Sequence, residues 1–112
     1  YIDTIKPDHS IYHHEAAYQN SYGIQALTTL AIINWLTSGT EFELPAKARE
    51  NFSETILAQF DFAADFELHP AVCGRFPYSN DGISRMLLPA FAFMAERDGE
   101  IIDAKMAKTL NG

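Results

Sequence analysis

Seven histidine, tyrosine and glutamate side chains crowd into a span of fourteen residues near the start of the chain, and they could carry proton chemistry. They are His9, Tyr12, His13, His14, Glu15, Tyr18 and Tyr22. Arg75 follows much later, directly after Gly74. Positioned His and Tyr side chains take or give protons, and an arginine stabilises negative charge that develops beside it. The cluster and Arg75 therefore predict a site for proton transfer next to an anionic group.

Such a site is suited to removing a proton from a carbon next to a carboxylate. That carbon is very weakly acidic, because losing the proton places a second negative charge beside the first. A bidentate arginine stabilises the developing enolate. A neutral His, or a Tyr whose ionised form the arginine stabilises, can take the proton, and a Tyr can also protonate the leaving oxygen. If the substrate is a uronic acid, the product is an unsaturated sugar, and no cofactor is needed.

Two other interpretations of the cluster stay open. His9 and His13 would share one helix face at positions i and i+4, and Glu15 or His69 could complete a metal-binding set. However, Pro7 and its polar neighbours disfavour a regular helix, and no second spaced His pair follows, so we predict no metal site. Alternatively, the His and Tyr side chains are polar edges of a core, with hydrogen bonds to the backbone.

The spacing of apolar residues predicts the helices that would position this cluster. Four helices are expected, at about residues 22–36, 45–60, 83–97 and 102–110. Gly39 is suited to the left-handed cap that ends the first of them. Pro89 predicts a kink or a late start in the third.

Loops make up much of the remaining chain. Residues 1–21 lack a sustained apolar period and are predicted to be extended or looping, and residues 69–82 contain two Pro and two Gly. No strand alternation is evident. The expected fold class is therefore all-α, with helices joined by long loops.

Composition and charge narrow the possible partners. The 112 residues are 47% hydrophobic and 21% charged, which fits a single globular segment, 1–112. The net charge of −7 disfavours nucleic acids and anionic membranes, so a polyanion would have to be held by local cations. No membrane span is predicted, and a lone cysteine excludes an internal disulfide. The first residues do not resemble a signal peptide and residue 1 is not Met, so we expect a fragment of a longer chain.

Two segments resemble polysaccharide lyase family 8, the chondroitin and hyaluronate lyases. Residues 5–23 resemble the active-site stretch of that family and read IKPDHSIYHHEAAYQNSYG, and residues 74–77 resemble its Gly-Arg-His-Pro stretch. The chain departs from the family pattern at His9, where Gly is usual. The resemblance implies helical hairpins that form part of an incomplete (α/α) toroid, followed in the parent chain by β-sandwich domains. It also implies cleavage of an acidic polysaccharide by β-elimination, in a secreted or periplasmic enzyme.

The resemblance implies roles for individual residues. Tyr22 corresponds to the catalytic Tyr, and Arg75 to the residue that contacts the uronate carboxylate or tunes that Tyr. The catalytic His is either His13 or His14. Hyaluronate and chondroitin AC lyases place it nine residues before the Tyr, which selects His13. Chondroitin ABC lyases have a His-Glu pair seven residues before the Tyr, whereas His14 lies eight before Tyr22. We favour His14, because the pair it forms with Glu15 matches the family pattern.

Further residues are expected to contact the substrate, and other functions stay open. Tyr18, Glu15 and Arg85 are the expected substrate-binding residues, although Arg85 could equally form a surface ion pair with a nearby acid. The main rival function is a non-catalytic carbohydrate-binding helical module that keeps its aromatic surface. A metal-dependent hydrolase ranks third.

Overall fold

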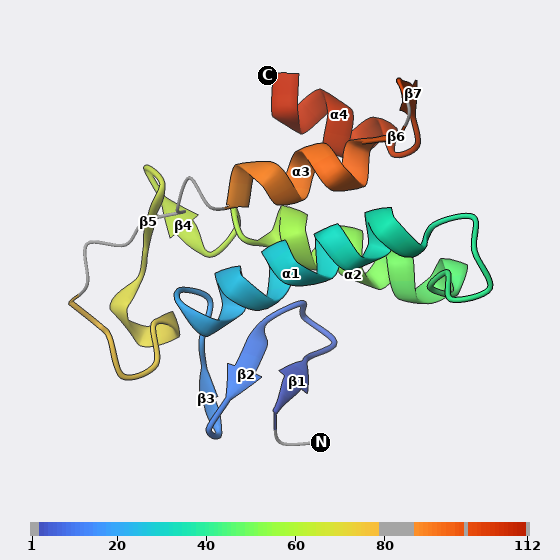
Figure 1. The fold of residues 1–112 in the computed structure, drawn as a ribbon. Coiled ribbons are helices and arrows are strands. Elements are labelled where there is room, and N and C mark those ends of the chain that lie inside the picture. Colours follow the sequence, from blue (N-terminus) through green and yellow to red (C-terminus); the bar gives the residue numbers. More distant parts are fainter. Residues whose placement is uncertain (1–2, 79–86, 98, 112) are drawn as a thin grey trace.

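The computed structural model describes residues 3–78, 87–97 and 99–111, and α-helices dominate these parts of the chain (Figure 1). The helices are α1 at Tyr22–Thr37, α2 at Ala46–Ala58, α3 at Leu88–Ala95 and α4 at Ala104–Asn111. The mainly helical class is thus confirmed. The predicted first, second and fourth helices each agree with the structure to within two residues at either end.

Helix α1 is apolar on its buried side and on much of its exposed side. One side is buried and includes Ile24, Leu27 and Ala31. The other side stays apolar although it is exposed, at Leu30, Ile32, Ile33 and Leu36. Gly39 follows the helix with a φ of 74°, which confirms the predicted left-handed end. No helix in the described parts of the chain has the length and apolarity to cross a membrane.

Helices α3 and α4 begin where their side chains allow. Pro89 lies in the first turn of α3, where its missing N–H costs nothing, so the late start is confirmed. Residues 83–86, also predicted to be helical, lie outside the described residues. At α4, the Oδ1 of Asp103 accepts hydrogen bonds from the N–H groups of Lys105 (2.9 Å) and Met106 (3.1 Å). This is the bonding of an N-cap, and it sets the start of α4.

Short β-strands correct the expectation of an all-α fold without strands. They are β1 (Thr4–Ile5), β2 (Ile11–His13), β3 (Ala16–Ala17), β4 (Ala63–Ala64), β5 (Glu67–Leu68), β6 (Glu96–Arg97) and β7 (Glu100–Ile101). The first three form an antiparallel sheet, and the others form two hairpins. Strands of two or three residues are too short to show the alternation that predicts a strand. The β6–β7 hairpin also ends α3 at Ala95, earlier than predicted.

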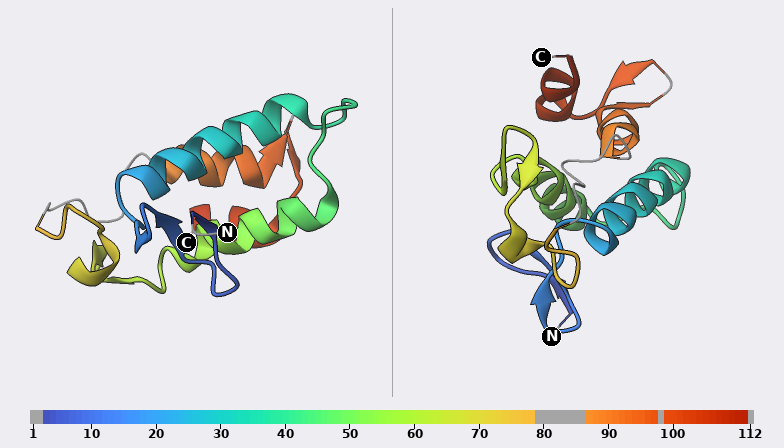
Figure 2. Two further views of the ribbon diagram at one scale, coloured as in Figure 1. Left: turned by 90° about the horizontal axis from the view of Figure 1, so that it is seen from below. Right: turned by 90° about the vertical axis from the view of Figure 1, so that its left-hand side faces the viewer.

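The core lies between the helices. Helix α1 packs against α3, and α3 packs against α4, while the three-stranded sheet lies on the opposite side of the α1–α2 layer (Figures 1 and 2). Leu27, Ile56, Leu87 and Met106 are at most 1% exposed. Truncating a buried Leu or Ile to Ala lowers the free energy of unfolding by roughly 2–5 kcal/mol. These buried side chains therefore stabilise the helical layer on which the sheet packs.

Candidate active site

A tight hairpin places His13 beside the first residue of α1. Strands β2 and β3 pair antiparallel with His13 opposite Ala16, so His14 and Glu15 form a two-residue turn. Both turn residues have positive φ, 51° and 63°, as a type I′ hairpin turn requires. Residues other than Gly rarely adopt this conformation, and such backbone is often found at functional sites. The hairpin directs the His13 ring towards Tyr22.

The aromatic rings in this region are in contact. The ring centroids of His13 and Tyr22 are 4.6 Å apart with an edge-on angle of 72°, whereas those of His14 and Tyr22 are 6.2 Å apart. The two His rings are 4.0 Å apart. His13 and Tyr22 are half-buried, and His14 is exposed. The structure therefore brings both predicted histidines to Tyr22, with His13 the nearer.

A carboxylate that the sequence did not indicate contacts the same hairpin. The Nδ1 of His13 lies 3.5 Å from the Oδ2 of Asp3, and the N–H of Glu15 donates to the Oδ1 of Asp3 over 3.3 Å. Pairing of Thr4 with Tyr12 between β1 and β2 brings Asp3 there. Asp3 can orient the His13 ring, as carboxylates commonly do for catalytic histidines. Its ten-residue separation from His13 matches no motif, and so short a strand pair gives no sequence signal.

The segment around Gly74 brings Arg75 to the site. Val72 and Cys73 lie beside the two residues that directly follow β3, through a bridge between Tyr18 and Cys73 and a 2.8 Å hydrogen bond from the Gln19 N–H to the Val72 carbonyl. The Nη2 of Arg75 then donates to the Tyr22 hydroxyl oxygen over 3.1 Å. Because a guanidinium is always charged, it stabilises any negative charge that develops on this oxygen. Two residues 53 positions apart, both predicted from the sequence, are thus in direct contact.

The remaining predicted site residues have different surroundings. Tyr18 is only 3% exposed, and its hydroxyl accepts a hydrogen bond from the Arg75 N–H over 3.1 Å. So buried a ring is not available to stack on a sugar in this structure, in contrast to its expected role in substrate binding. Glu15 is exposed at the turn. Arg85 lies outside the described residues.

The comparison with known families decides the class to which this arrangement belongs. A family model described as "Lyase, catalytic" matches residues 1–110. The chain belongs to this family, the catalytic domain of family 8 polysaccharide lyases. The resemblance found in the sequence is thereby confirmed. No curated protein and no solved structure gives a significant match.

A cavity adjoins the His13–Tyr22 contact of this lyase segment. It has a volume of about 450 Å³. His13, Tyr22 and Asp3 line it together with mostly apolar residues of β1, β2 and α1, namely Thr4, Ile5, Ile11, Tyr12, Ala26, Leu27 and Leu30. The two rings most suited to proton transfer therefore border a space that a ligand can enter.

The residues of the alternative metal site are separated in the lyase segment. His9 lies 3.4 Å from the Thr55 hydroxyl on α2, and the Nδ1 of His69 accepts a hydrogen bond from the Ala71 N–H. Across residues 3–78, 87–97 and 99–111, no group of three or more His, Cys, Asp or Glu side chains is arranged to hold a metal ion. The metal interpretation of His9, His13 and Glu15 therefore has no geometric support in this part of the chain.

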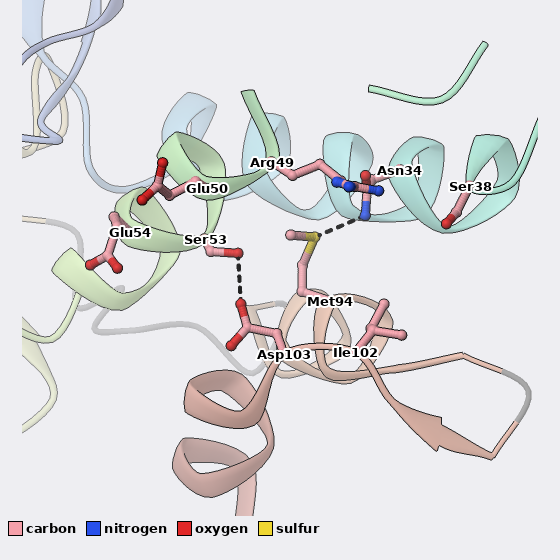
Figure 3. Close-up of a pocket in the computed structure, with 9 residues that line it drawn as sticks. All are labelled: Asn34, Ser38, Arg49, Glu50, Ser53, Glu54, Met94, Ile102 and Asp103. Carbon is pink, nitrogen blue, oxygen red and sulfur yellow. Dashed lines mark hydrogen bonds between the residues drawn. The ribbon is translucent and has the colours of Figure 1, made fainter. Parts of the chain in front are cut away.

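A second cavity, also of about 450 Å³, lies between α1, α2 and the start of α4 (Figure 3). Several of its polar groups are already paired. Arg49 forms an ion pair with Glu43, Ser53 donates to Asp103, and the Nδ2 of Asn34 lies 3.4 Å from the sulfur of Met94. Its lining contains neither His nor Tyr. The hairpin site is therefore the better candidate for proton transfer.

Proposed function

We propose that the chain is part of the helical catalytic domain of a larger lyase, which cleaves a uronic-acid-containing polysaccharide of the glycosaminoglycan type by β-elimination. Family membership supports the lyase class. The contacts among His13, Tyr22 and Arg75 support proton transfer beside a carboxylate. The reaction needs no cofactor, because acid–base groups and one cation supply all its steps.

In the proposed reaction, a base takes the proton from the carbon next to the uronate carboxylate. The electron pair left on that carbon forms a double bond to the neighbouring carbon as the glycosidic carbon–oxygen bond there breaks. The leaving oxygen takes a proton from Tyr22. Arg75 stabilises the charge that develops on the carboxylate or on the Tyr22 oxygen, so both halves of the reaction depend on the contact between these two residues.

The observation that carries this proposal is the 3.1 Å hydrogen bond from the Nη2 of Arg75 to the Tyr22 hydroxyl. A guanidinium at this distance favours the oxyanion that forms when Tyr22 gives up its proton. The Arg75 side chain is exposed, so a carboxylate of the substrate can reach it from solvent.

The geometry favours His13 over His14 as the partner of Tyr22. His13 is the nearer of the two rings, and the Asp3 carboxylate lies against its Nδ1, so its Nε2 is the nitrogen left for proton exchange. His14 is exposed in the turn and is suited to a second contact with the polymer. We assign Glu15 and Arg85 to the same substrate-binding role.

An acidic polysaccharide is compatible with a chain of net charge −7 because its recognition is local. We propose that the rest of the parent chain completes the groove. The remaining helical hairpins would close an incomplete (α/α) toroid, covering the apolar residues that α1 exposes, such as Ile33 and Leu36. A polymeric substrate outside the cell fits a secreted or periplasmic enzyme.

The test is to mix the full-length protein with chondroitin, dermatan, hyaluronan, heparan and alginate and to follow the ultraviolet absorbance of an unsaturated uronate. We expect absorbance to rise on at least one polymer, equally with and without a chelator. A rise that the chelator abolishes would favour a metal-dependent enzyme. Binding of a polymer by the folded protein without any rise would contradict the lyase and favour the carbohydrate-binding module.

A further inference from the structure

Tyr18 is buried where β3 meets the segment that carries Arg75. It is 3% exposed, and its backbone forms the bridge to Cys73. Its ring centroid is 5.2 Å from that of Tyr22. Tyr18 therefore contacts both partners of the Arg75–Tyr22 hydrogen bond while having almost no access to solvent or substrate.

Gly74 lies directly against the Tyr18 ring. A Cβ placed on Gly74 would be 2.2 Å from the Cζ of Tyr18, so only glycine allows the backbone to approach the ring this closely. The close approach brings the next N–H, that of Arg75, within 3.1 Å of the Tyr18 hydroxyl oxygen. Ring and hydroxyl together fix the backbone from which the Arg75 side chain extends.

Arg75 needs such an anchor because its side chain is long and exposed. An exposed arginine samples many rotamers, and holding it in one geometry costs conformational entropy. In this structure its guanidinium carbon lies 5.8 Å from the Tyr22 ring centroid and 4.9 Å from that of Phe76, besides the hydrogen bond to Tyr22. Fixing the backbone N–H of Arg75 limits the positions that its guanidinium can reach, and so reduces the fraction of side-chain conformations that make no contact with Tyr22.

We propose that Tyr18 is a positioning residue, which holds the Arg75 backbone through its phenolic oxygen so that the guanidinium meets the Tyr22 hydroxyl. This inference rests on the proposed lyase function, and it assigns Tyr18 to the support of the site and not to contact with the sugar. It also gives the Tyr18 hydroxyl a role that a buried phenylalanine ring would not supply.

The test is Tyr18→Phe in the full-length enzyme, which keeps the ring against Gly74 and removes only the acceptor for the Arg75 N–H. We expect kcat to fall about 10-fold, the equivalent of one lost hydrogen bond. Arg75→Lys should affect the same kinetic parameter: if it lowers mainly kcat, Tyr18→Phe should also lower mainly kcat, and if it raises mainly KM, Tyr18→Phe should do the same. Tyr78→Phe is the matched control and should change neither, because Tyr78 is 90% exposed.

A double variant separates positioning from general stability. In the Arg75→Ala background, Tyr18→Phe should change kcat less than about 2-fold, because the side chain that it positions is gone. An equal loss of kcat in both backgrounds, or no loss in either, would overturn the proposal. Tyr22→Phe serves as the reference for the mechanism: if it leaves turnover intact, the proposed role of Tyr22 fails, and with it the reason to position Arg75. If the unmodified protein forms no unsaturated product, the lyase function itself fails.

A second measurement does not depend on the variant folding or on turnover. Hydrogen exchange of the Arg75 amide in the unmodified protein should be slowed at least about 10-fold relative to an unprotected peptide, because the N–H is donated to Tyr18. Exchange at the unprotected rate would refute the contact on which the proposal depends.

Discussion

Replacing Gly74 with alanine tests the packing that holds the site together. The added Cβ would lie 2.2 Å from the Cζ of Tyr18 and 2.4 Å from its Cε1 and Cε2. Gly74 also has a φ of 54°, in the left-handed region that a side chain disfavours. Because the ring is buried, it cannot move away without disturbing its contacts with Tyr22 and with the Arg75 N–H.

The expected cost has two parts. A residue with a Cβ in the left-handed region costs about 1–2 kcal/mol. Forcing a methyl group into a filled space costs about 1–3 kcal/mol more. Gly74→Ala should therefore lower the free energy of unfolding by about 2–5 kcal/mol, a large part of the roughly 5–15 kcal/mol of a typical domain.

Gly99→Ala supplies the matched control. Gly99 has a φ of 84°, but apart from its chain neighbours no atom of the described residues lies within 4 Å of the point that a Cβ would occupy there, so only the backbone cost applies. Urea unfolding followed by the helical circular dichroism signal, in the same full-length background, measures both variants. Equal destabilisation by the two substitutions would refute the claim that Tyr18 packs against Gly74.

Three further predictions address the three-stranded sheet and the residues next to its strands. His13→Gln should lower kcat about 10²–10⁴-fold while His14→Gln lowers it less, and equal losses would contradict the assignment of the nearer ring. Asp3→Asn should lower kcat with little change in KM, which steady-state kinetics measures. Hydrogen bonds from the hydroxyl and N–H of Ser10 hold the pKa of Asp8 below its ordinary value of 3.8, so they stabilise the fold above that value and the gain is lost as the pH falls through the lowered pKa. Asp8→Asn should therefore lower the urea midpoint of unfolding, relative to the unmodified protein, at about pH 7 but not at about pH 2. An equal difference between the two proteins at both pH values would contradict this.

The helices were predictable because their signals are local. The apolar run after Tyr22 and the glycine at position 39 determine α1 and its end, and Pro89 determines the late start of α3. In these segments the spacing of apolar residues and the capping residues favour the same structure. These signals lie within or next to the helix that they determine.

The sheet and half of the site were not predictable because they depend on distant contacts. Strands of two or three residues are too short to show alternation, so the sequence showed neither the pairing of β1 with β2 nor the approach of Asp3 to His13. Residue types alone placed Arg75 with the His and Tyr cluster, but only the family resemblance selected Tyr22 as its partner, since composition and spacing say nothing about a contact between residues 53 positions apart. The burial of Tyr18 likewise depends on Gly74, far along the chain.

The most direct test of the proposed mechanism is the turnover and polymer binding of Tyr22→Phe in the full-length protein. On a polymer that the unmodified protein cleaves, formation of the unsaturated product should fall at least about 10²-fold, because the group that exchanges the proton is removed. Affinity for the polymer should stay within about 2-fold, since the ring and its contact with His13 remain. Turnover that survives the loss of this one hydroxyl would contradict the proposed mechanism.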